Sequence, residues 1–257
     1  MASEAELQTV RGRLLGLIDE GRILRVEIDR PDPRVIDGFL ALGDLCSTVS
    51  DALDELGVGG GIGATRLQPR VPGTRVAGPA ITIRYAPEGA NVGAIRGRGE
   101  RARLADRDLY AVGREGDVAV FDVQGFEGAS IMGGLSARWA RRLGIAGCVV
   151  DGAVRDVEAI RRDGIPVWSR AVTPVSGKHR LAAVEINGAV SLAGLQVSPG
   201  DLVVADETGI CVVPREHIDA TFAICRASED AERALIEAID GGLEPEEVVK
   251  ILQPDRW

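Results

Sequence analysis

Short apolar runs alternate with amphipathic stretches along the middle of the chain, a pattern that predicts strands alternating with helices in an α/β fold. The strands are rich in β-branched residues and bounded by glycine, proline or aspartate, and we place them at 76–85, 117–122, 147–150 and 167–171. Helical spacing between or beside these runs predicts helices over 95–110, 135–143 and 157–162. A closing series of short strands is predicted through residue 213.

Both ends of the chain have the apolar spacing of helices. The predicted elements near the start are helices over 5–20 and 31–45 with a short strand over 22–28 between them. Thr48 and Asp51 have the spacing of a capping box that would begin a helix ending at Gly57, with a loop over 57–63. Two helices are predicted over 215–237 and 244–252. We therefore divide the chain into a helical extension (1–44), a core domain (45–214) and C-terminal helices (215–257) that pack on the core or on a neighbouring subunit.

Composition is that of a compact protein with a large aliphatic core. The chain has 257 residues, 45% hydrophobic but only 4% aromatic. No apolar run approaches the roughly 20 residues that span a bilayer, and the start lacks the regions of a signal peptide, so we expect a cytoplasmic protein without membrane contact. The net charge of −9 argues against a nucleic-acid surface. The four cysteines are scattered and favour reduced core thiols over a zinc site.

Arginines are concentrated in two segments, 96–114 and 138–162. We interpret most of them as solvated helix faces and intersubunit salt bridges. Local positive potential within an acidic protein can nevertheless attract a small anionic substrate.

The most informative stretch runs from Gly133 to Asp156. Because a buried strand is predicted over 147–150, Arg155 and Asp156 lie past its end, and Gly133 and Gly134 begin the next helix upstream. Free N–H groups at such a helix start can bind a carboxylate, which Arg155 can meet with two parallel hydrogen bonds. Asp156 supplies the oxygen that Mg²⁺ or Mn²⁺ prefers. An equally weighted alternative is that Asp156 only caps the helix over 157–162.

Gly134, the twenty-residue spacer and Arg155-Asp156 resemble the signature of the RraA-like superfamily. This superfamily includes the class II 4-hydroxy-4-methyl-2-oxoglutarate/4-carboxy-4-hydroxy-2-oxoadipate aldolases and the regulators of ribonuclease E activity. Further similar landmarks, in the family's order, are Ser50–Leu53, Ala77–Thr82, Pro199–Gly209 and Val212–Pro214. The resemblance covers roughly residues 45 to 225.

The resemblance implies a β/β/α sandwich similar to the swivelling phosphohistidine-domain fold, assembled as a homotrimer or as a homohexamer of two trimers with active sites between subunits. It also implies a divalent-metal lyase that cleaves a 4-hydroxy-2-oxo di- or tricarboxylic acid to pyruvate and an oxo acid, with oxaloacetate decarboxylation through the same enolate. Asp156 would hold the metal and Arg155 would balance the enolate charge. The N–H groups of Gly134, Leu135 and Ser136 would bind the substrate carboxylate.

Several other polar residues are weaker candidates. Gly133 belongs to the same turn, and Asp122, Gln124 and Glu127 lie near the strand end that leads to it, although loop polarity explains them equally well. Helix capping explains Asp51 equally well, and a turn between strands favours the residue type of Glu207. His179 and His217 match no metal-ligand spacing and are interpreted as surface or structural residues.

Lysine is scarce, since only Lys178 and Lys250 are present and neither is predicted at a buried strand end. A Schiff-base aldolase is therefore disfavoured. Where many relatives have Gly-Asp-Asn, this chain has Gly89-Ala90-Asn91, so an acidic group is missing and the substrate pocket is expected to differ. The alternative function is a non-catalytic regulator that binds a ribonuclease or another protein.

Overall fold

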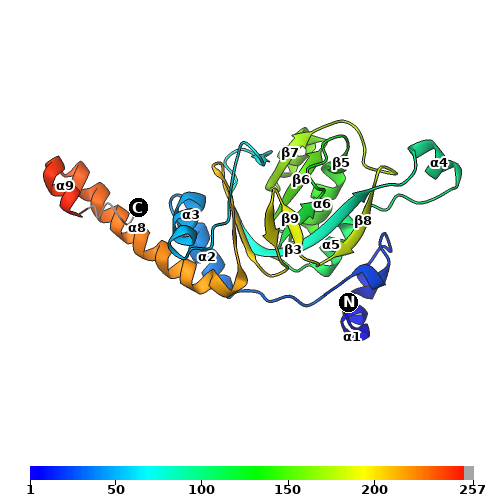
Figure 1. Cartoon of the computed structure of the whole chain (residues 1–257), viewed down its shortest axis with the longest axis horizontal. Helices are drawn as coiled ribbons and strands as arrows, with labels where there is room; N and C mark the ends of the chain where they lie inside the picture. Colours follow the sequence, from blue (N-terminus) through cyan, green and yellow to red (C-terminus); the bar gives the residue numbers. More distant parts are fainter. Residues whose placement is uncertain (252–257) are drawn as a thin grey trace.

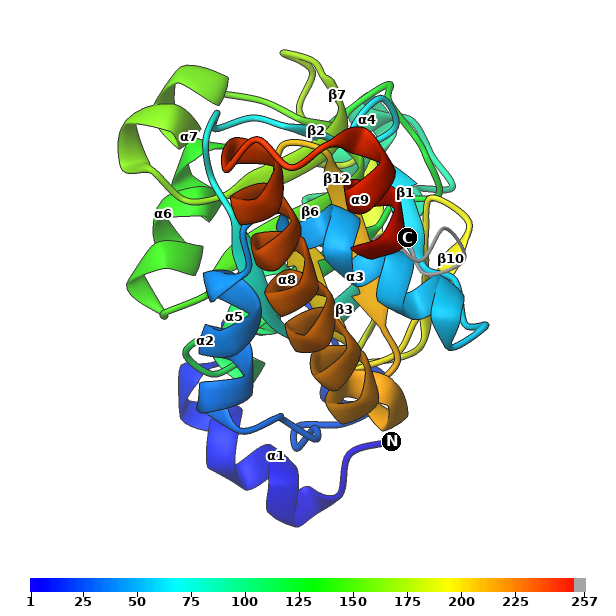
Figure 2. The same ribbon diagram turned by 90° about the vertical axis from the view of Figure 1, so that its left-hand side faces the viewer.

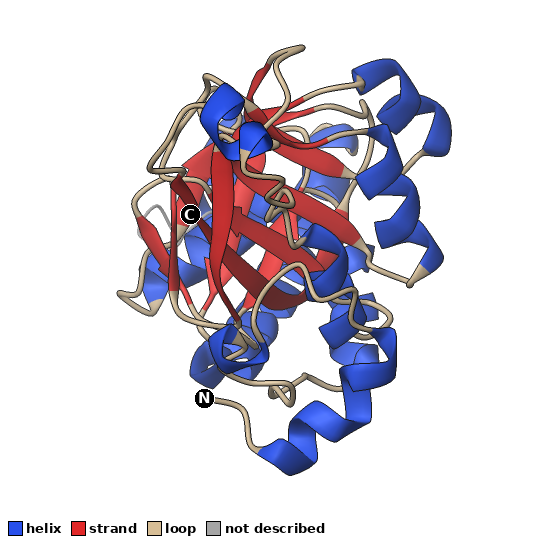
Figure 3. Cartoon of the chain, turned by 90° about the vertical axis from the view of Figure 1, so that its right-hand side faces the viewer, coloured by secondary structure: helices blue, strands red, loops and turns tan. Residues whose placement is uncertain are grey.

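Strands from the middle of the chain join into one ten-stranded mixed sheet in the computed structural model, which describes residues 1–251 and side chains through residue 248 (Figure 3). Its main path is, in order, β1 (Gly61–Gly63), β12 (Gly209–Val213), β11 (Leu202–Ala205), β3 (Val76–Pro87), β4 (Val118–Asp122), β6 (Gly147–Val154), β7 (Val167–Val172) and β2 (Gln68–Pro69). Off this path, β5 (Ser130–Met132) pairs with β6 and β8 (Leu181–Ile186) with β3, while β9 (Val190–Leu192) and β10 (Leu195–Val197) form a separate hairpin.

The centre of the sheet is parallel, through β3, β4, β6 and β7. Every residue of β4 and β6 is buried, which explains why these strands are continuous apolar runs without alternation. The register places Asp122 of β4 opposite Asp151 of β6. The carboxyl ends of these parallel strands lie at one edge of the sheet, where the Gly133–Asp156 stretch begins and ends.

The helices form two groups around the sheet. In chain order they are α1 (Glu4–Val10), α2 (Pro33–Ala41), α3 (Leu45–Glu55), α4 (Val92–Gly97), α5 (Asp106–Val112), α6 (Gly134–Arg142), α7 (Val157–Asp163), α8 (Ile218–Asp240) and α9 (Pro245–Ile251). One core cluster packs α5, α6 and α7 on β4 and β6, and another packs α2, α3 and α8 on β11 and β12. Figures 1 and 2 show these groups on separate parts of the molecule.

The α/β fold class is confirmed, and so are the strands predicted at 76–85, 117–122 and 167–171. The strand predicted over 147–150 is longer and continues to Val154. Asp151 and Gly152 are thus strand residues, because the pairing of β6 with β5 and β7 extends the ladder past the apolar run. Arg155 and Asp156 still follow the strand end, as predicted.

The helix predicted over 5–20 is too long, since α1 ends at Val10 and a single 3-10 turn follows at Arg11–Arg13. Gly16, with φ of +65°, lies in a conformation that a helix does not contain. The predicted strand over 22–28 reduces to one bridge between Ile23 and Ile186. Within 31–45 the helix spans only Pro33–Ala41, after which the chain turns into α3.

Three further predictions were wrong in detail. The predicted capping box at Thr48 lies inside α3, which begins at Leu45, and the Thr48 hydroxyl donates to the Asp44 carbonyl. The loop over 57–63 contains β1, paired antiparallel with β12. The helix over 95–110 is two short helices, α4 and α5, separated by an irregular segment. Tertiary pairing and packing decided each of these boundaries, which local spacing does not encode.

The C-terminal helices extend away from the body, as Figure 1 shows for α8 and α9. The buried residues of α8 are Ile218, Thr221 and Cys225, all in its first eight positions. Farther along, Ile236 and Ile239 are half exposed. The prediction of a helix reaching residue 252 extends beyond the described residues. Within residues 1–251, no helix is long and apolar enough to cross a membrane.

Candidate functional site

The turn after β6 places Asp156 in an uncommon backbone conformation. Its φ and ψ are +54° and +42°, the left-handed region that aspartate and asparagine enter more readily than most residues. Asp156 occupies the N-cap position of α7, yet its side chain makes no capping hydrogen bond to that helix. Such strain is retained where surrounding structure enforces it, and it often accompanies a functional role.

The Asp156 carboxylate instead faces the start of the neighbouring helix α6. Its Oδ2 accepts a hydrogen bond from the Gly134 N–H at 3.2 Å, and the Arg155 Nε lies 3.4 Å from the same oxygen. The sequence left two alternatives open, a helix cap or a site that joins the two segments. The contact between Asp156 and Gly134 favours the second alternative, because the carboxylate is directed away from its own helix.

Both glycines of the turn are required by this close approach. A Cβ at Gly133 would lie 2.7 Å from Asp156 Oδ2 and 2.9 Å from Arg155 Cγ. At Gly134 it would lie 2.7 Å from the Ala159 Cβ. Side chains here would therefore push α6 and α7 apart, so glycine is needed for contact between the two segments.

The first turn of α6 presents backbone donors beside this carboxylate. Its first internal bond runs from the Ala137 N–H to the Gly133 carbonyl, so the preceding N–H groups of Leu135 and Ser136 have no acceptor within the helix. Leu135 has a 79% exposed side chain, while the Ser136 side chain is buried toward the core. The predicted substrate-binding residues thus form one turn, with Arg155 and Asp156 next to it.

The donor set around Asp156 fits a cation that keeps much of its water. The side chain is 46% exposed, and Oδ1 accepts no hydrogen bond from the described residues. No three histidine, cysteine or acidic side chains gather into a metal-holding group in the described part of the chain. A single carboxylate suits Mg²⁺, which is often bound by one or two carboxylates with several waters. It does not suit a zinc site, which needs three or four protein ligands.

The weaker candidates at the β4 end have other roles. Both oxygens of the buried Asp122 carboxylate accept backbone hydrogen bonds, Oδ1 from Gln124 and Oδ2 from Ser191. Asp122 lies opposite Asp151 in the sheet. Asp151 precedes Arg155 by four residues, which is about 13 Å along an extended strand. Gln124 is exposed in a left-handed turn with φ of +54°. Asp122 is therefore a structural carboxylate, and neither residue joins the glycine turn.

Asp51 and Glu207 lie elsewhere on the chain. The Glu207 carboxylate accepts a hydrogen bond from the Gly73 N–H. The carbonyl of the preceding Asp206 accepts one from the Trp168 side chain, and Trp168 lies opposite Val149 near the start of β6. This turn is at the amino ends of the parallel strands, opposite the Gly134 turn. Asp51 is exposed on α3, whose first turn is bonded to Asp206. Within one chain, neither acid approaches the proposed site.

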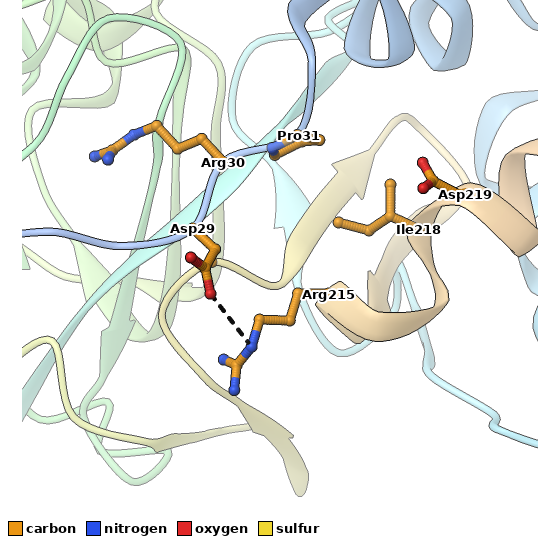
Figure 4. Close-up of a pocket in the computed structure, with 7 residues that line it drawn as sticks. Asp29, Arg30, Pro31, Arg215, Ile218 and Asp219 are labelled. Atoms are coloured by element: carbon orange, nitrogen blue, oxygen red, sulfur yellow. Dashed lines mark ion pairs between the residues drawn. The ribbon is translucent and has the colours of Figure 1, made fainter.

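Two surface clefts lie away from the glycine turn. One of about 160 Å³ is lined by residues that include Asp29, Arg30 and Arg215, and Figure 4 shows Arg215 facing Asp29, with 3.9 Å between their charged groups. The other, about 420 Å³, lies between α3 and the β1–β12 pair and includes Asp51. Neither of these two clefts contains Gly134 or Asp156.

Sequence reasoning missed a buried polar group directly behind this turn. Asp106, 5% exposed, begins α5, and the hydroxyl of Tyr110 on the same helix lies 3.0 Å from the Ser136 side-chain oxygen. The available signal was the four-residue spacing of Asp106 and Tyr110, which places both on one helix face. Asn91, by contrast, caps α4 through its side chain.

Other expectations have clear outcomes. All four cysteines are free and buried, as predicted, and burial raises the pKa of Cys148 and Cys225 to about 12. Lys178 is exposed, while the Lys250 side chain lies outside the described residues. His179 is buried, so of the predicted surface and structural positions it has the structural one. Many arginines pair with acids of the same chain, including Arg103 with Glu88, Arg114 with Glu27 and Arg138 with Asp163.

The family model described as RraA-like, Aldolase/RraA, matches residues 46–212. The chain belongs to the RraA-like family. The resemblance identified from Gly134 and Arg155-Asp156 is therefore confirmed, and the matched region includes the whole glycine turn and the Asp156 turn.

Named relatives of this RraA-like chain include both larger proteins and aldolases. It is 33% identical over 191 residues to protein DlpA of Legionella pneumophila, covering 73% of this chain but only 29% of DlpA. It is 34% identical over 195 residues to a Halalkalibacterium halodurans protein provisionally named as a 4-hydroxy-4-methyl-2-oxoglutarate aldolase, covering 74% of this chain and 82% of the relative. The names of such relatives point to aldolase chemistry.

Solved structures share the fold. An uncharacterized protein from Pseudomonas syringae is similar with a TM-score of 0.71 and 29% identity, covering 86% of this chain and 99% of that one. Streptomyces coelicolor RraAS2, described as an unusual member of the RNase ES inhibitor RraA protein family, is similar with a TM-score of 0.68 and 26% identity, covering 80% and 98%. The family thus contains proteins described as inhibitors as well as those named aldolases.

Proposed function

We propose that this RraA-like protein is a divalent-metal-dependent lyase that cleaves a 4-hydroxy-2-oxo di- or tricarboxylic acid to pyruvate and a second oxo acid. The observation that carries the proposal is the Asp156 carboxylate, directed from the end of β6 onto the Gly134 N–H with Arg155 beside it. Relatives named as aldolases support the same reaction class.

Asp156 is the residue that would hold Mg²⁺ or Mn²⁺. When bound, the cation would act as a Lewis acid toward the 2-oxo group. The Gly134 N–H fixes one carboxylate oxygen, leaving Oδ1 available for a cation and water. In this proposal the hydrogen bond from the Gly134 N–H orients the Asp156 carboxylate, so the backbone at the start of α6 fixes the geometry of a side chain that precedes α7.

The first turn of α6 would bind the substrate carboxylate. The N–H groups of Leu135 and Ser136 precede the first internal helix bond, and the helix dipole adds partial positive charge at this end. The Arg155 side chain is 38% exposed beside them, so it can donate to the substrate and balance negative charge that develops on the 2-oxo oxygen as the C–C bond breaks.

A pyruvate-release assay tests this function directly. The full chain is assayed with a panel of 4-hydroxy-2-oxo acids and with oxaloacetate, in Mg²⁺, in Mn²⁺ and in EDTA. We expect release of pyruvate from at least one substrate with metal, and loss of the activity in EDTA that returns with excess metal. If every substrate is inert with metal present, the lyase function is wrong. The similarity to RraAS2 then favours the alternative of a regulator that binds a ribonuclease.

We also propose that the chain acts as a homo-oligomer, either a trimer or a hexamer. The C-terminal arm, which we define as residues 230–251, leaves Ile236, Ile239 and Leu243 at 50%, 53% and 40% exposure. Leu135 and Trp139 on α6 are also large exposed apolar residues. An oligomer would cover such surface. Light scattering after size exclusion tests this: Ile236→Glu with Ile239→Glu should reduce the mass, and a monomeric wild-type chain would contradict it.

A further inference from the structure

Two helices of opposite charge each have an exposed apolar face. On the C-terminal arm, Ile236 and Ile239 are 50% and 53% exposed. On α6, Leu135 and Trp139 are 79% and 40% exposed. Large apolar side chains that gather on an exposed face indicate a surface that another molecule covers. Each of the two faces is therefore expected to have an occupant.

The face of the C-terminal arm is apolar in its middle and acidic at its ends. Glu232 and Asp240 lie four positions before and after Ile236, and Ile239 lies three positions after it. Residues at these spacings share one side of a helix. Both acids are exposed, and neither has an ion pair with the described side chains, which extend through residue 248. The whole arm has seven acidic and two basic residues, a net charge of −5.

The α6 face, which we define as Leu135, Arg138, Trp139 and Arg142, has the opposite charge. Leu135 and Trp139 are four positions apart, and an arginine follows each of them by three positions, so all four share one side of the helix. α6 contains three arginines and no acidic residue. Arg138 is paired with Asp163. Arg142 is exposed and has no ion pair among the side chains that the structure describes, so its charge is available to a partner.

Charge decides which of these faces can pair. Two arms side by side would bring two net charges of −5 together, and two α6 faces would bring arginines together. Like charges across an interface cost free energy, whereas charges of opposite sign beside an apolar seam select the partner helix. An arm against the α6 face satisfies both the apolar and the charged positions. Figure 1 shows the arm extending away from the body that contains α6, so the two faces of one chain are apart.

We propose that the C-terminal arm of one copy of this chain docks on the α6 face of a second copy, with its apolar residues against the Leu135–Trp139 pair and its acids near Arg142. The proposal rests on the proposed homo-oligomer and not on the lyase function. Because the two faces differ, the contact is heterologous, and its repetition around a ring gives a closed oligomer such as the proposed trimer. Leu135 is in the first turn of α6, so the docked arm borders the candidate site.

Chemical cross-linking tests the contact directly. A variant with both Leu135→Cys and Ile239→Cys is treated with a short bismaleimide, which joins two thiols only when they lie close together. The four native cysteines are buried. We expect covalent dimers and larger species from this double variant in denaturing gels, and single chains from each single variant. The control is Gly97→Cys with Ile239→Cys, which should stay uncross-linked because Gly97 is exposed on α4, outside the α6 face.

Charge reversal tests the pairing in solution by sedimentation velocity over a range of concentrations. Arg142→Glu should weaken association by about tenfold or more, and so should Glu232→Arg combined with Asp240→Arg, because like charges would then face each other. The triple variant should return to within about threefold of wild type, since opposite charges face each other again. Glu237→Arg is the control on the same arm, because it makes the same change of charge outside the face and should have less than about a threefold effect.

Other results would overturn the proposal. If the wild type is oligomeric but the double-cysteine variant does not cross-link, or if the triple variant associates as weakly as its parents, the arm docks elsewhere and only the homo-oligomer stands. If the wild type is a monomer at every concentration, both the docking and the homo-oligomer are wrong, and the two faces serve a protein of another sequence. Cross-linking together with an inert pyruvate-release assay supports the docking and contradicts only the lyase function.

Discussion

Aspartates occupy two regions of the same sheet edge and have opposite surroundings. In the region under the β9–β10 hairpin, Asp122 and Asp151 are 3% and 4% exposed, and each uses both oxygens. Asp151 accepts from Arg170 through Oδ1 and from the Ala193 N–H through Oδ2. At the glycine turn, the Asp156 side chain is 46% exposed and has one backbone donor.

Neither residue type nor strand position separates Asp122 and Asp151 from Asp156. The difference is that both oxygens of the two structural carboxylates accept hydrogen bonds, whereas the candidate ligand has one oxygen that accepts none. Asp122 and Asp151 hold the β9–β10 hairpin through Ser191 and Ala193. Both carboxylates are buried and each of their oxygens already accepts a hydrogen bond, so a hydrated cation has little access to them. Asp156 is held firmly enough to be oriented and still has an oxygen available, which is the combination that metal binding requires.

The largest expected effect is on catalysis at Asp156. Asp156→Asn keeps the size of the side chain and tolerates the left-handed backbone, but it removes the charge that would anchor the cation. We expect kcat/KM for pyruvate release to fall by about 100-fold or more, because a Lewis acid contributes several kcal/mol. Unfolding free energy should change by less than about 0.5 kcal/mol, as is usual at exposed positions. A folded variant with wild-type turnover would show that Asp156 is not the ligand.

The reverse outcome is expected at Asp151. Asp151→Ala leaves the Arg170 guanidinium, whose side chain is 23% exposed, without its carboxylate and frees the Ala193 N–H. We expect chemical denaturation to show a loss of about 3 kcal/mol in unfolding free energy, while activity per folded molecule stays within about threefold. If Asp151→Ala loses as much activity as Asp156→Asn and keeps its stability, the structural role of Asp151 is wrong.

A smaller effect is expected from crowding the Asp156 carboxylate. Gly133→Ala places a Cβ 2.7 Å from Oδ2 and must move Asp156 or Arg155. The metal concentration for half-maximal activity should rise about tenfold, the lower end of the range for changes that misorient a ligand. Gly97→Ala is the control, because a Cβ there meets no atom within 4 Å. Unchanged metal dependence in Gly133→Ala would mean that the position of Asp156 is not critical.

The smallest effect concerns pH and the buried Asp106. Since burial raises its pKa, the native chain retains a proton that the unfolded chain releases at its ordinary carboxyl pKa. The contribution of Asp106 to the free energy of unfolding is therefore fully present below the ordinary carboxyl pKa. It falls as the pH rises from there through the raised pKa of the native chain. Relative to Asp106→Asn, wild type should lose unfolding free energy over that range. A difference that is constant with pH would contradict the raised pKa.

The site was predictable from sequence to the extent that its chemistry is local. The apolar run before Asp151 placed Arg155 and Asp156 after a strand, and the helical spacing after Gly134 placed the glycines at a helix start. Asp122 and Asp156 could not be told apart, because the donors that saturate Asp122 include Ser191, far along the chain. The contact between Tyr110 and Ser136 was missed for the same reason, since the two residues are 26 positions apart in different helices.

By itself the sequence determined the α/β alternation, the strands of the parallel centre and the residues of the glycine turn, because periodicity and turn chemistry are encoded within a few neighbouring positions. The tertiary structure decided which carboxylate remains available. It directed Asp156 away from its own helix and onto Gly134, gave the oxygens of Asp122 and Asp151 distant donors, and brought Tyr110 to Ser136. Hydrogen-bond satisfaction depends on contacts between distant segments, which only the folded chain brings together.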